Sequence, residues 1–196
     1  MKNCEYVKGC AKKTDFICDD KFEVCMVGRS NAGKSSLINA IFNNNKLAKT
    51  SSSQGKTRLV NYFLVDKTFY LVDLPGYGFH LAGKENEKSW SVLIEEYFAH
   101  KEDKKLVLLL LDIRHLPSED DKQMLKFLNF YSIPFKIIAT KSDKLAKSKR
   151  KNAAFSLAKE MNVGTNDVYF CSSETKENID VIKNLIDERV KEYEMS

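Results

Sequence analysis

The chain has 196 residues, of which 43% are hydrophobic and 30% charged, and its formal net charge is +5. This length predicts one domain with a substantial core, and the composition is that of a soluble globular protein. The longest apolar run, Leu106–Leu111, has only the length of a strand, and the first ten residues lack the apolar core of a signal peptide. We therefore expect a cytoplasmic protein with no membrane partner.

The five cysteines favour free thiols in a reducing compartment. Their number is odd, and no two of them have C-x-x-C spacing. Cys25 and Cys171 lie in apolar runs, where a small buried side chain fits well. Zinc bound by Cys4, Cys10 and Cys18 is the alternative, but no clustered histidines support it.

In chain order, residues 1–20 carry no clear pattern and are treated as an N-terminal extension, in which Phe16 and Ile17 could pack or add to a sheet edge. A strand is predicted at 21–27, and a helix at 34–43 that Asn43-Asn44-Asn45 ends. Between them lies GRSNAGKS, Gly28–Ser35, a full G-x-x-x-x-G-K-[ST] phosphate-binding motif.

This order of strand, glycine loop and helix is the one that phosphate binding needs. Gly28 and Gly33 allow unusual backbone angles and close approach, and the loop N–H groups and the helix N-terminus then face the anion. Lys34 supplies a mobile positive charge for the β- and γ-phosphates, and Ser35 supplies a hydroxyl for Mg²⁺. The flanking elements disfavour the alternative, a chance match in a glycine-bearing turn.

Residues 45–58 are polar and rich in serine and lysine, which is typical of a long functional or disordered loop. Five of its hydroxyls could ligate Mg²⁺, and position does not choose among Thr50, Ser51, Ser52, Ser53 and Thr57. Two strands follow, Leu59–Val65 and Thr68–Asp73. The short link at Asp66-Lys67 predicts an antiparallel hairpin.

Asp73 ends this hairpin and begins the sequence DLPG. In phosphate-loop NTPases an acid at this place holds Mg²⁺, usually through water, and Gly76 frees a backbone N–H for a terminal phosphate. Asp-x-x-Gly is also a common turn. Its place about 40 residues after a phosphate loop makes the metal role a strong prediction.

The rest of the chain alternates helices and strands. The predicted elements are a helix at about 86–101, a strand at Lys105–Asp112, a helix from Ser118 to about Tyr131, a strand at Pro134–Ala139, a helix opened by a basic stretch and ending near Asn162, a strand at Asp167–Cys171, and a final helix that contains Ile179 and Val190. This alternation predicts a parallel α/β sheet covered on both faces, with ligands beyond the carboxyl ends of its strands.

Thr140-Lys141-Ser142-Asp143 follows one of these strands and is interpreted as a guanine reader. A carboxylate at Asp143 accepts hydrogen bonds from the N1–H and the exocyclic amine of guanine, whereas adenine would leave it unpaired. The aliphatic stem of Lys141 can cover the purine face. The alternative is a helix N-cap made by Ser142 or Asp143. Backbone N–H groups of Ser172-Ser173-Glu174 could meet the guanine O6.

The ordered set GRSNAGKS, Gly55-Lys56-Thr57, DLPG, TKSD and SSE resembles a translation-factor-related small GTPase. More closely, GRSNAGKSSLINA, SQGKTRLVNYF, DLPGYG and TKSDKL resemble the EngB (YihA/YsxC) family of bacterial ribosome-biogenesis GTPases, over nearly the whole chain from about residue 20. The resemblance implies a single Ras-like P-loop GTPase domain over 21–196. It also implies a three-layer α/β fold whose mostly parallel six-stranded sheet has one antiparallel edge strand.

The resemblance also implies the functional residues. GTP or GDP would be bound by Gly28, Arg29, Ser30, Asn31, Ala32, Gly33, Lys34, Ser35, Gly55, Lys56, Thr57, Arg58, Leu59, Asp73, Leu74, Pro75, Gly76, Thr140, Lys141, Ser142, Asp143, Ser172, Ser173 and Glu174. Mg²⁺ would be held by Ser35, Thr57 and Asp73, and hydrolysis would depend on Lys34, Thr57, Gly76 and Asn31. Thr140 replaces the asparagine of the commonest GTPase pattern, as it does elsewhere in this family.

The implied role is GTP hydrolysis in the assembly of the large ribosomal subunit, with an effect on cell division. The expected partners are a large-subunit precursor and its ribosomal RNA, and the chain is expected to be a monomer off the ribosome. A guanine-nucleotide-dependent scaffold in cell division is the alternative. The sequence lacks the coiled coil, lipidation motif or amphipathic anchor that would favour it.

Tyr77 occupies the position after DLPG where Ras-like enzymes carry a water-orienting glutamine. It cannot offer an amide, so intrinsic hydrolysis is expected to be slow. In relatives, an asparagine at the position of Asn31 can coordinate a potassium ion in the place of an arginine finger, and bracing of the loop by Asn31 is the alternative.

A basic stretch follows the guanine reader and comprises Lys141, Lys144, Lys147, Lys149, Arg150 and Lys151. Most charge runs are solvated faces. Here the cations crowd a predicted helix N-terminus, which the helix dipole disfavours. Phosphate contact with ribosomal RNA is therefore the favoured interpretation.

Overall fold

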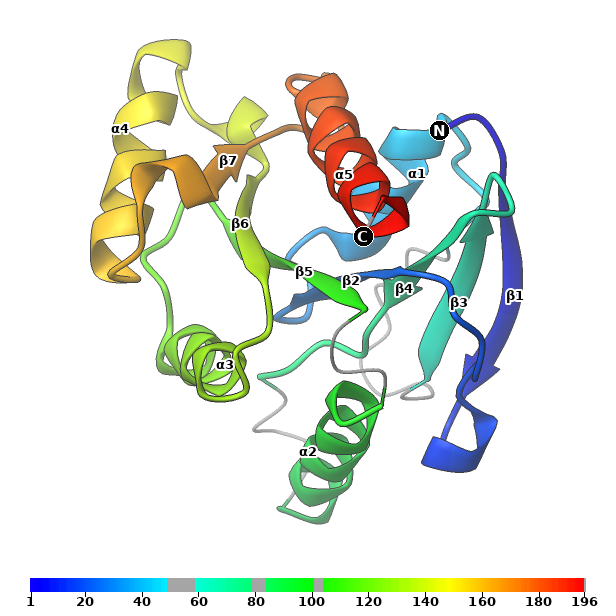
Figure 1. Cartoon of the computed structure of the whole chain (residues 1–196). Coiled ribbons are helices and arrows are strands. Elements are labelled where there is room, and N and C mark those ends of the chain that lie inside the picture. Colours follow the sequence, from blue (N-terminus) through cyan, green and yellow to red (C-terminus); the bar gives the residue numbers. More distant parts are fainter. Residues whose placement is uncertain (49–58, 79–83, 101–103, 196) are drawn as a thin grey trace.

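The structure is a computed structural model that describes residues 1–48, 59–78, 84–100 and 104–195 (Figure 1). Its centre is a seven-stranded sheet in the order β1-β3-β4-β2-β5-β6-β7. The strands in chain order are β1 (Cys4–Cys10), β2 (Glu23–Gly28), β3 (Val60–Val65), β4 (Phe69–Asp73), β5 (Lys105–Asp112), β6 (Phe135–Thr140) and β7 (Val168–Phe170). Short 3₁₀ helices lie at Lys13–Asp15 (η1), Ser142–Lys144 (η3) and Thr165–Asp167 (η4).

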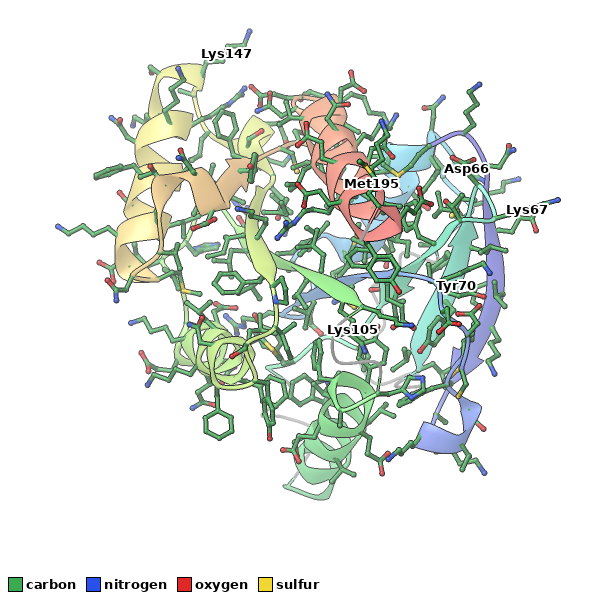
Figure 2. The ribbon with its side chains drawn as sticks, in the orientation of Figure 1. Asp66, Lys67, Tyr70, Lys105, Lys147 and Met195 are labelled. Atoms are coloured by element: carbon green, nitrogen blue, oxygen red, sulfur yellow. The ribbon has the colours of Figure 1, made fainter. Side chains whose placement is uncertain are left out.

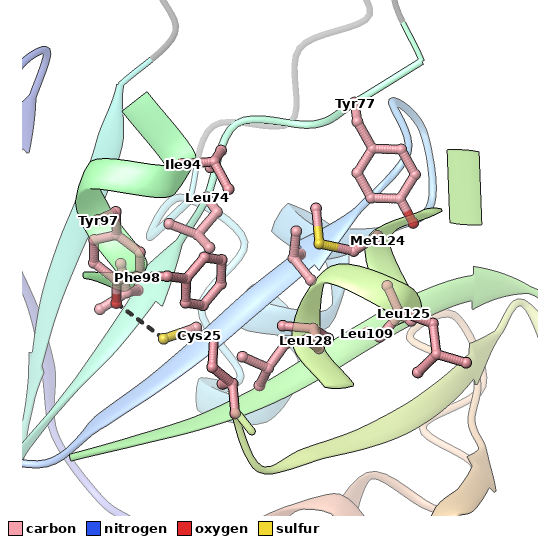
Figure 3. Packing of buried hydrophobic residues seen from close by; sticks show 14 of the residues in the cluster. Cys25, Leu74, Tyr77, Ile94, Tyr97, Phe98, Leu109, Met124, Leu125 and Leu128 are labelled. Atoms are coloured by element: carbon pink, nitrogen blue, oxygen red, sulfur yellow. Dashed lines mark hydrogen bonds between the residues drawn. The ribbon is translucent and has the colours of Figure 1, made fainter. Parts of the chain in front are cut away.

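Helices cover both faces of this sheet, which confirms the predicted three-layer α/β fold. One face carries α1 (Lys34–Phe42) and α5 (Ile179–Glu194), and the other carries α2 (Lys84–Phe98), α3 (Glu119–Phe130) and α4 (Lys147–Glu160) (Figure 1). A hydrophobic core lies on each face of the sheet, and the side chains of successive residues in the central strands enter these two cores alternately. Leu108 of β5 lies in the core under α1 and α5, and Leu109 lies in the core under α2 and α3, which Figure 3 shows from close by.

The predicted hairpin is confirmed, because β3 pairs antiparallel with β4. Asp66 and Lys67 turn the chain with φ angles of 45° and 64°, the left-handed pair that two-residue hairpins use. Asp66 is an acceptable residue there because its carboxylate accepts hydrogen bonds from the backbone N–H groups of Lys2 and Asn3. β3 runs against the other described strands, as the predicted single antiparallel strand should.

The edge of the sheet differs from the expected six strands. β1 pairs antiparallel with β3 from Cys4–Val65 to Cys10–Val60, so it forms the edge and β3 lies inside it. Most side chains of β1 are exposed, including Tyr6 and Val7. The strand therefore lacks the alternation of apolar and polar residues by which strands are found in a sequence.

The local signals at helix ends behave as predicted. Ser118 and Asp121 form a reciprocal capping box at the start of α3, and Asn43 ends α1 in the left-handed conformation with φ 50°. No helix in the described part of the chain is both long and apolar enough to cross a membrane.

The cysteines are free thiols, and Cys10, Cys25 and Cys171 are buried. Cys4 and Cys10 lie at opposite ends of β1, so they do not converge. Across the described ranges, no three metal-ligating side chains come together.

A buried polar cluster fixes α2 to the centre of the sheet. The hydroxyl of Tyr97 donates a 2.6 Å hydrogen bond to the carboxylate of Glu23 in β2 and lies 2.9 Å from the sulfur of Cys25, the contact dashed in Figure 3. Lys105 of β5 is 2% exposed, and its ammonium lies 5.1 Å from the centre of the Tyr97 ring. Burial raises the pKa of Tyr97 well above its usual value, so the hydroxyl remains a donor.

We therefore expect Tyr97→Phe to lower the free energy of unfolding by about 1–3 kcal/mol, because the buried carboxylate loses a donor while the ring still fills its place. Urea unfolding of the purified protein measures this. Tyr131→Phe is the matched control, since that side chain is 53% exposed. Equal midpoints for the two variants would show that the buried hydroxyl contributes nothing.

Candidate functional site

The described candidate residues gather at one edge of the sheet. Residues 29–35 follow β2, residues 73–76 lie at the end of β4, residues 140–143 lie at the end of β6, and residues 172–174 follow β7. Leu59 precedes the antiparallel β3 and so begins at the same edge. Residues 55–58, including Thr57, lie outside the described part of the chain. The carboxyl ends of parallel strands are where such sheets bind ligands.

The two glycines of the phosphate loop differ from the prediction in one respect. Gly28 ends β2 without a positive φ, and it is glycine because a Cβ would come within 2.6 Å of the Leu110 carbonyl oxygen. Gly33 has a φ of 96°, a conformation that side chains with a Cβ rarely adopt, and α1 begins directly after it. Gly76 lies against the loop, where a Cβ would come within 3.0 Å of the Ser30 nitrogen and 3.1 Å of the Lys34 ammonium. Glycine therefore lets the DLPG turn close against the phosphate loop.

Lys34 of the phosphate loop and Asp73 of the DLPG turn carry opposite charges that act on each other. The Lys34 ammonium donates to the carbonyl oxygen of Gly28 at 3.3 Å. Burial lowers the pKa of Lys34, and the charge of Asp73 opposes that shift. Burial also raises the pKa of Asp73 to about 6, against the opposing charge of Lys34. The Oδ1 atom of Asp73 is buried and has no hydrogen-bond partner among the described residues. A buried carboxylate oxygen of this kind suits a hard cation.

Tyr77 does not project toward the phosphate loop as a water-orienting group would. Its side chain is 5% exposed and lies in the core below α3, where its hydroxyl donates to Asp121 at 2.7 Å (Figure 3). Its backbone pairs with the phosphate loop, since Ser30 N–H donates to the Tyr77 carbonyl at 3.2 Å. Trp90 of α2 packs edge-on against the Tyr77 ring and donates to the Pro75 carbonyl at 3.0 Å. This turn is thereby attached to both α2 and α3.

Thr140 and Lys141 connect β6 to the phosphate loop. The buried Thr140 hydroxyl donates to the Ala32 carbonyl at 2.7 Å, and the Lys141 ammonium donates to the Asn31 carbonyl at 2.7 Å. Lys141 also pairs at 2.9 Å with Asp112, the last residue of β5. Sequence reasoning missed Asp112, although its place at a strand end beside the other loops was a usable signal.

Asp143 has the charge state that guanine recognition needs. Its carboxylate accepts from the Ser172 hydroxyl at 2.6 Å and lies 3.1 Å from the Lys144 ammonium. These contacts, the hydrogen bond from Ser172 first, lower the pKa of Asp143, so the group is an ionised acceptor at neutral pH. The alternative of a helix cap fails, because α4 begins after Ala146 and neither Ser142 nor Asp143 caps it.

The remaining candidate residues are those at 172–174 and Leu59. Ser172 is fully buried and acts through its hydroxyl on Asp143, a contact that the prediction of backbone N–H donors at 172–174 did not include. Ser173 is half-buried and Glu174 is exposed. The Leu59 side chain lies beside Gly9 of β1. Two further residues take part without having been predicted to do so: Glu177 accepts a hydrogen bond from Ser142 of the guanine-reading loop, and Arg150 bonds to Glu177.

Comparisons with known proteins agree with this geometry. Residues 23–141 match the family model described as a 50S ribosome-binding GTPase. The "Probable GTP-binding protein EngB" of Fusobacterium nucleatum subsp. nucleatum is 44% identical over 97% of this chain and 98% of its own length. The protein of the same description from Mycoplasma mycoides subsp. mycoides is 49% identical over 76% of each chain.

Solved structures share the fold. The crystal structure of a probable GTP-binding protein engB superposes with a TM-score of 0.70 at 23% identity, covering 87% of this chain and 99% of that one. A structure of Era in complex with MgGDPNP and nucleotides of 16S ribosomal RNA superposes with a TM-score of 0.63 at 20% identity, over 87% of this chain and 56% of that one. A G-x-x-x-x-G-K-[ST] loop and an ionised Asp143 lie at one sheet edge, the family model matches residues 23–141, and the Fusobacterium relative is 44% identical over 97% of the chain. The chain therefore belongs to the EngB family of GTP-binding proteins and is a GTPase.

Proposed function

We propose that this GTPase is a cytoplasmic switch in the assembly of the large ribosomal subunit, that it contacts ribosomal RNA through α4, and that normal cell division depends on it. The observation that carries the proposal is a set of three exposed lysines, Lys147, Lys149 and Lys151, on the first two turns of α4, called the α4 lysines below. In support, the matching family model is described as ribosome-binding, and Era, which shares the fold, forms a complex with nucleotides of 16S ribosomal RNA.

The basic stretch divides into two groups with different surroundings. Lys141, Lys144 and Arg150 pair with Asp112, Asp143 and Glu177, respectively, so they serve the site itself. The three α4 lysines are exposed, and Figure 2 shows Lys147 pointing outward from the end of the helix.

The position of the α4 lysines at a helix N-terminus is also electrostatically unfavourable in the protein on its own. The first turn of α4 contains no acid, and its N-cap, Ala146, offers no side-chain hydrogen bond. Cations at a helix N-terminus cost a few tenths of a kcal/mol each. Their cost is offset when polyanionic phosphates approach, and counterion release then adds to the affinity.

We expect the triple variant Lys147→Gln, Lys149→Gln, Lys151→Gln to sediment less with large ribosomal subunits. It should also lower the slope of log affinity against log salt by about 2–3, roughly one for each phosphate that is no longer neutralised. Its GTP hydrolysis in the absence of ribosomes should be unchanged. Arg150 is left intact because it belongs to the guanine site.

The control is Lys8→Gln, Lys12→Gln, Lys13→Gln, which changes the charge equally on exposed residues of β1 and η1, on the far side of the molecule from α4 (Figure 1). Undiminished sedimentation of the α4 variant, or an equal loss in both variants, would contradict an RNA contact at α4.

The proposal includes Mg²⁺ held by Asp73 and Ser35, with Thr57 as a further ligand. The buried, unpartnered Oδ1 of Asp73 supports this assignment, and Ser35 stands in the first turn of α1 beside Lys34. A cation bound there neutralises charge on the β- and γ-phosphate oxygens. Lys34 and the loop N–H groups hold the same phosphates from the protein side.

The raised pKa of Asp73 makes this binding dependent on pH. The carboxyl is protonated below about pH 6, and a proton on it competes with the cation. At subsaturating Mg²⁺, GDP affinity should therefore fall as pH drops from about 7 to about 5, by up to about tenfold per unit below the pKa. Asp73→Asn is the control. It lacks the titrating carboxyl of Asp73, whereas the phosphates of the nucleotide titrate in both proteins. Parallel pH profiles for the two proteins would remove Asp73 from the metal site.

Potassium dependence is the second part of the proposed hydrolysis mechanism. With Tyr77 buried, Asn31 of the phosphate loop is the candidate cation ligand, because its side chain is exposed and its φ is 65°. We expect faster GTP turnover in potassium chloride than in matched sodium chloride, and loss of the difference in Asn31→Gly, since glycine keeps the left-handed backbone without strain. Equal rates in both salts, or a potassium effect that survives in Asn31→Gly, would favour an activating partner instead.

A further inference from the structure

We propose that Glu177 is a positioning residue for guanine recognition, because it clamps the loop at 140–143 to the loop at 172–174. Arg150 of α4 holds Glu177 in this place. The proposal rests on the assignment of Asp143 as the guanine acceptor, and it gives a role to two residues outside the expected nucleotide contacts.

Glu177 bonds to both loops at once. One carboxylate oxygen accepts a hydrogen bond from the Ser142 hydroxyl, and the other accepts from Nη1 of Arg150 at 2.6 Å. The backbone carbonyl of the same residue accepts from the Ser172 N–H at 3.1 Å. The two serines are therefore joined through one residue.

These two serines are the ones that control Asp143. Ser142 precedes Asp143 in the chain, and the Ser172 hydroxyl donates to the Asp143 carboxylate at 2.6 Å. Both serines are fully buried, at 0% exposure, so neither can move without moving its neighbours. A shift of Glu177 therefore reaches the guanine acceptor from two sides.

The local backbone directs the Glu177 side chain inward. Lys176 and Asn178 have left-handed φ angles of 62° and 56°, so Glu177 lies between two turning residues. Asn178 anchors this turn by donating from its side-chain amide to the Phe170 carbonyl of β7 at 2.9 Å. The turn costs conformational strain that its contacts must offset.

Arg150 and Glu177 form a charge-assisted pair that is largely shielded from solvent. Their side chains are 11% and 26% exposed, and Arg150 also donates from Nε to the Leu145 carbonyl at 3.0 Å. The hydrogen bond from Ser142, followed by the contact with Arg150, lowers the pKa of Glu177, so it is ionised at neutral pH. A shielded, doubly bonded pair of this kind is stronger than an exposed surface pair.

The clamp is distant in sequence from the phosphate loop and bonds only to the base-reading side, so its loss should weaken base recognition selectively. We expect Glu177→Ala, which removes the hydrogen bonds from both Ser142 and Arg150, to raise the Kd for GDP about 5- to 30-fold because the Asp143 carboxylate is then held less firmly, while the Kd for ADP changes little. Glu177→Gln keeps an acceptor for Ser142 and should lie between wild type and Glu177→Ala. Because Ser142 acts through Glu177, adding Ser142→Ala to Glu177→Ala should cause no further loss.

The experiment is competition of GDP and ADP against a fluorescent guanine nucleotide, with thermal unfolding of each nucleotide-free variant alongside. Asp167→Asn is the matched control, since Asp167 forms an ion pair with Lys136 in the same half of the protein without bonding to either loop. The proposal predicts a lower ratio of GDP to ADP affinity in Glu177→Ala and an ADP affinity equal to that of the control, which shows that the variant is folded in the assay even though its unfolding temperature falls. An unchanged ratio, or equal weakening of both nucleotides, would overturn it.

Asp143→Asn separates failure of the clamp from failure of the guanine assignment. If Asp143→Asn loses its preference for GDP and Glu177→Ala keeps it, Asp143 reads guanine without help from Glu177. If Asp143→Asn also keeps the preference, the guanine reader itself is wrongly placed and the proposal for Glu177 fails with it.

Discussion

Two bonds from the end of β6 to the carbonyl groups of the phosphate loop fix the geometry on which the site depends. Thr140 bonds to Ala32 and Lys141 bonds to Asn31, so the loop that faces the phosphates and the loop that faces the base cannot move independently. The parallel register that pairs Asp112 with Thr140 brings the third partner, Asp112, to the same point. A nucleotide that contacts both loops, as proposed above, would meet them at a fixed separation, and this preorganisation would lower the entropic cost of its binding.

Several charged residues at the edge of the sheet that carries the site form ion pairs with one another. Asp112 accepts from both Arg114 and Lys141, which holds the pKa of Asp112 well below its usual range and keeps the group ionised. Glu177 likewise forms an ion pair, with Arg150 of α4. α4 therefore contributes Arg150 to the contacts around Ser142 and Asp143 and also presents exposed lysines, although both come from one basic run of sequence.

The sequence predicts those parts of the protein whose local structure or chemistry requires particular residue types at a particular spacing. The phosphate loop, the hairpin at Asp66-Lys67, the capped α3 and the strand at Lys105–Asp112 all have the form predicted from local pattern. β1 was missed because neither of its faces is regularly apolar. Glu177 and Arg150 were missed because their partners lie 35 and 27 residues away, and only the folded chain joins them. The sequence shows that Tyr77 cannot supply a catalytic amide. It does not show the hydrogen bond from Tyr77 to Asp121, because these residues also meet only in the folded chain.

The buried carboxylate of Asp73 has a consequence for the lifetime of the protein in the cell. A carboxyl whose pKa rises to about 6 on folding stabilises the folded state fully only below the unfolded value of 3.8, and that contribution is lost as pH rises through 6. At neutral pH the folded chain therefore carries an unfavourable buried charge, which a cation bound at Asp73, as proposed above, would relieve. Ligands that bind only the folded state lower the unfolded fraction that proteases degrade. The abundance of this GTPase should accordingly follow the guanine nucleotide supply of the cell.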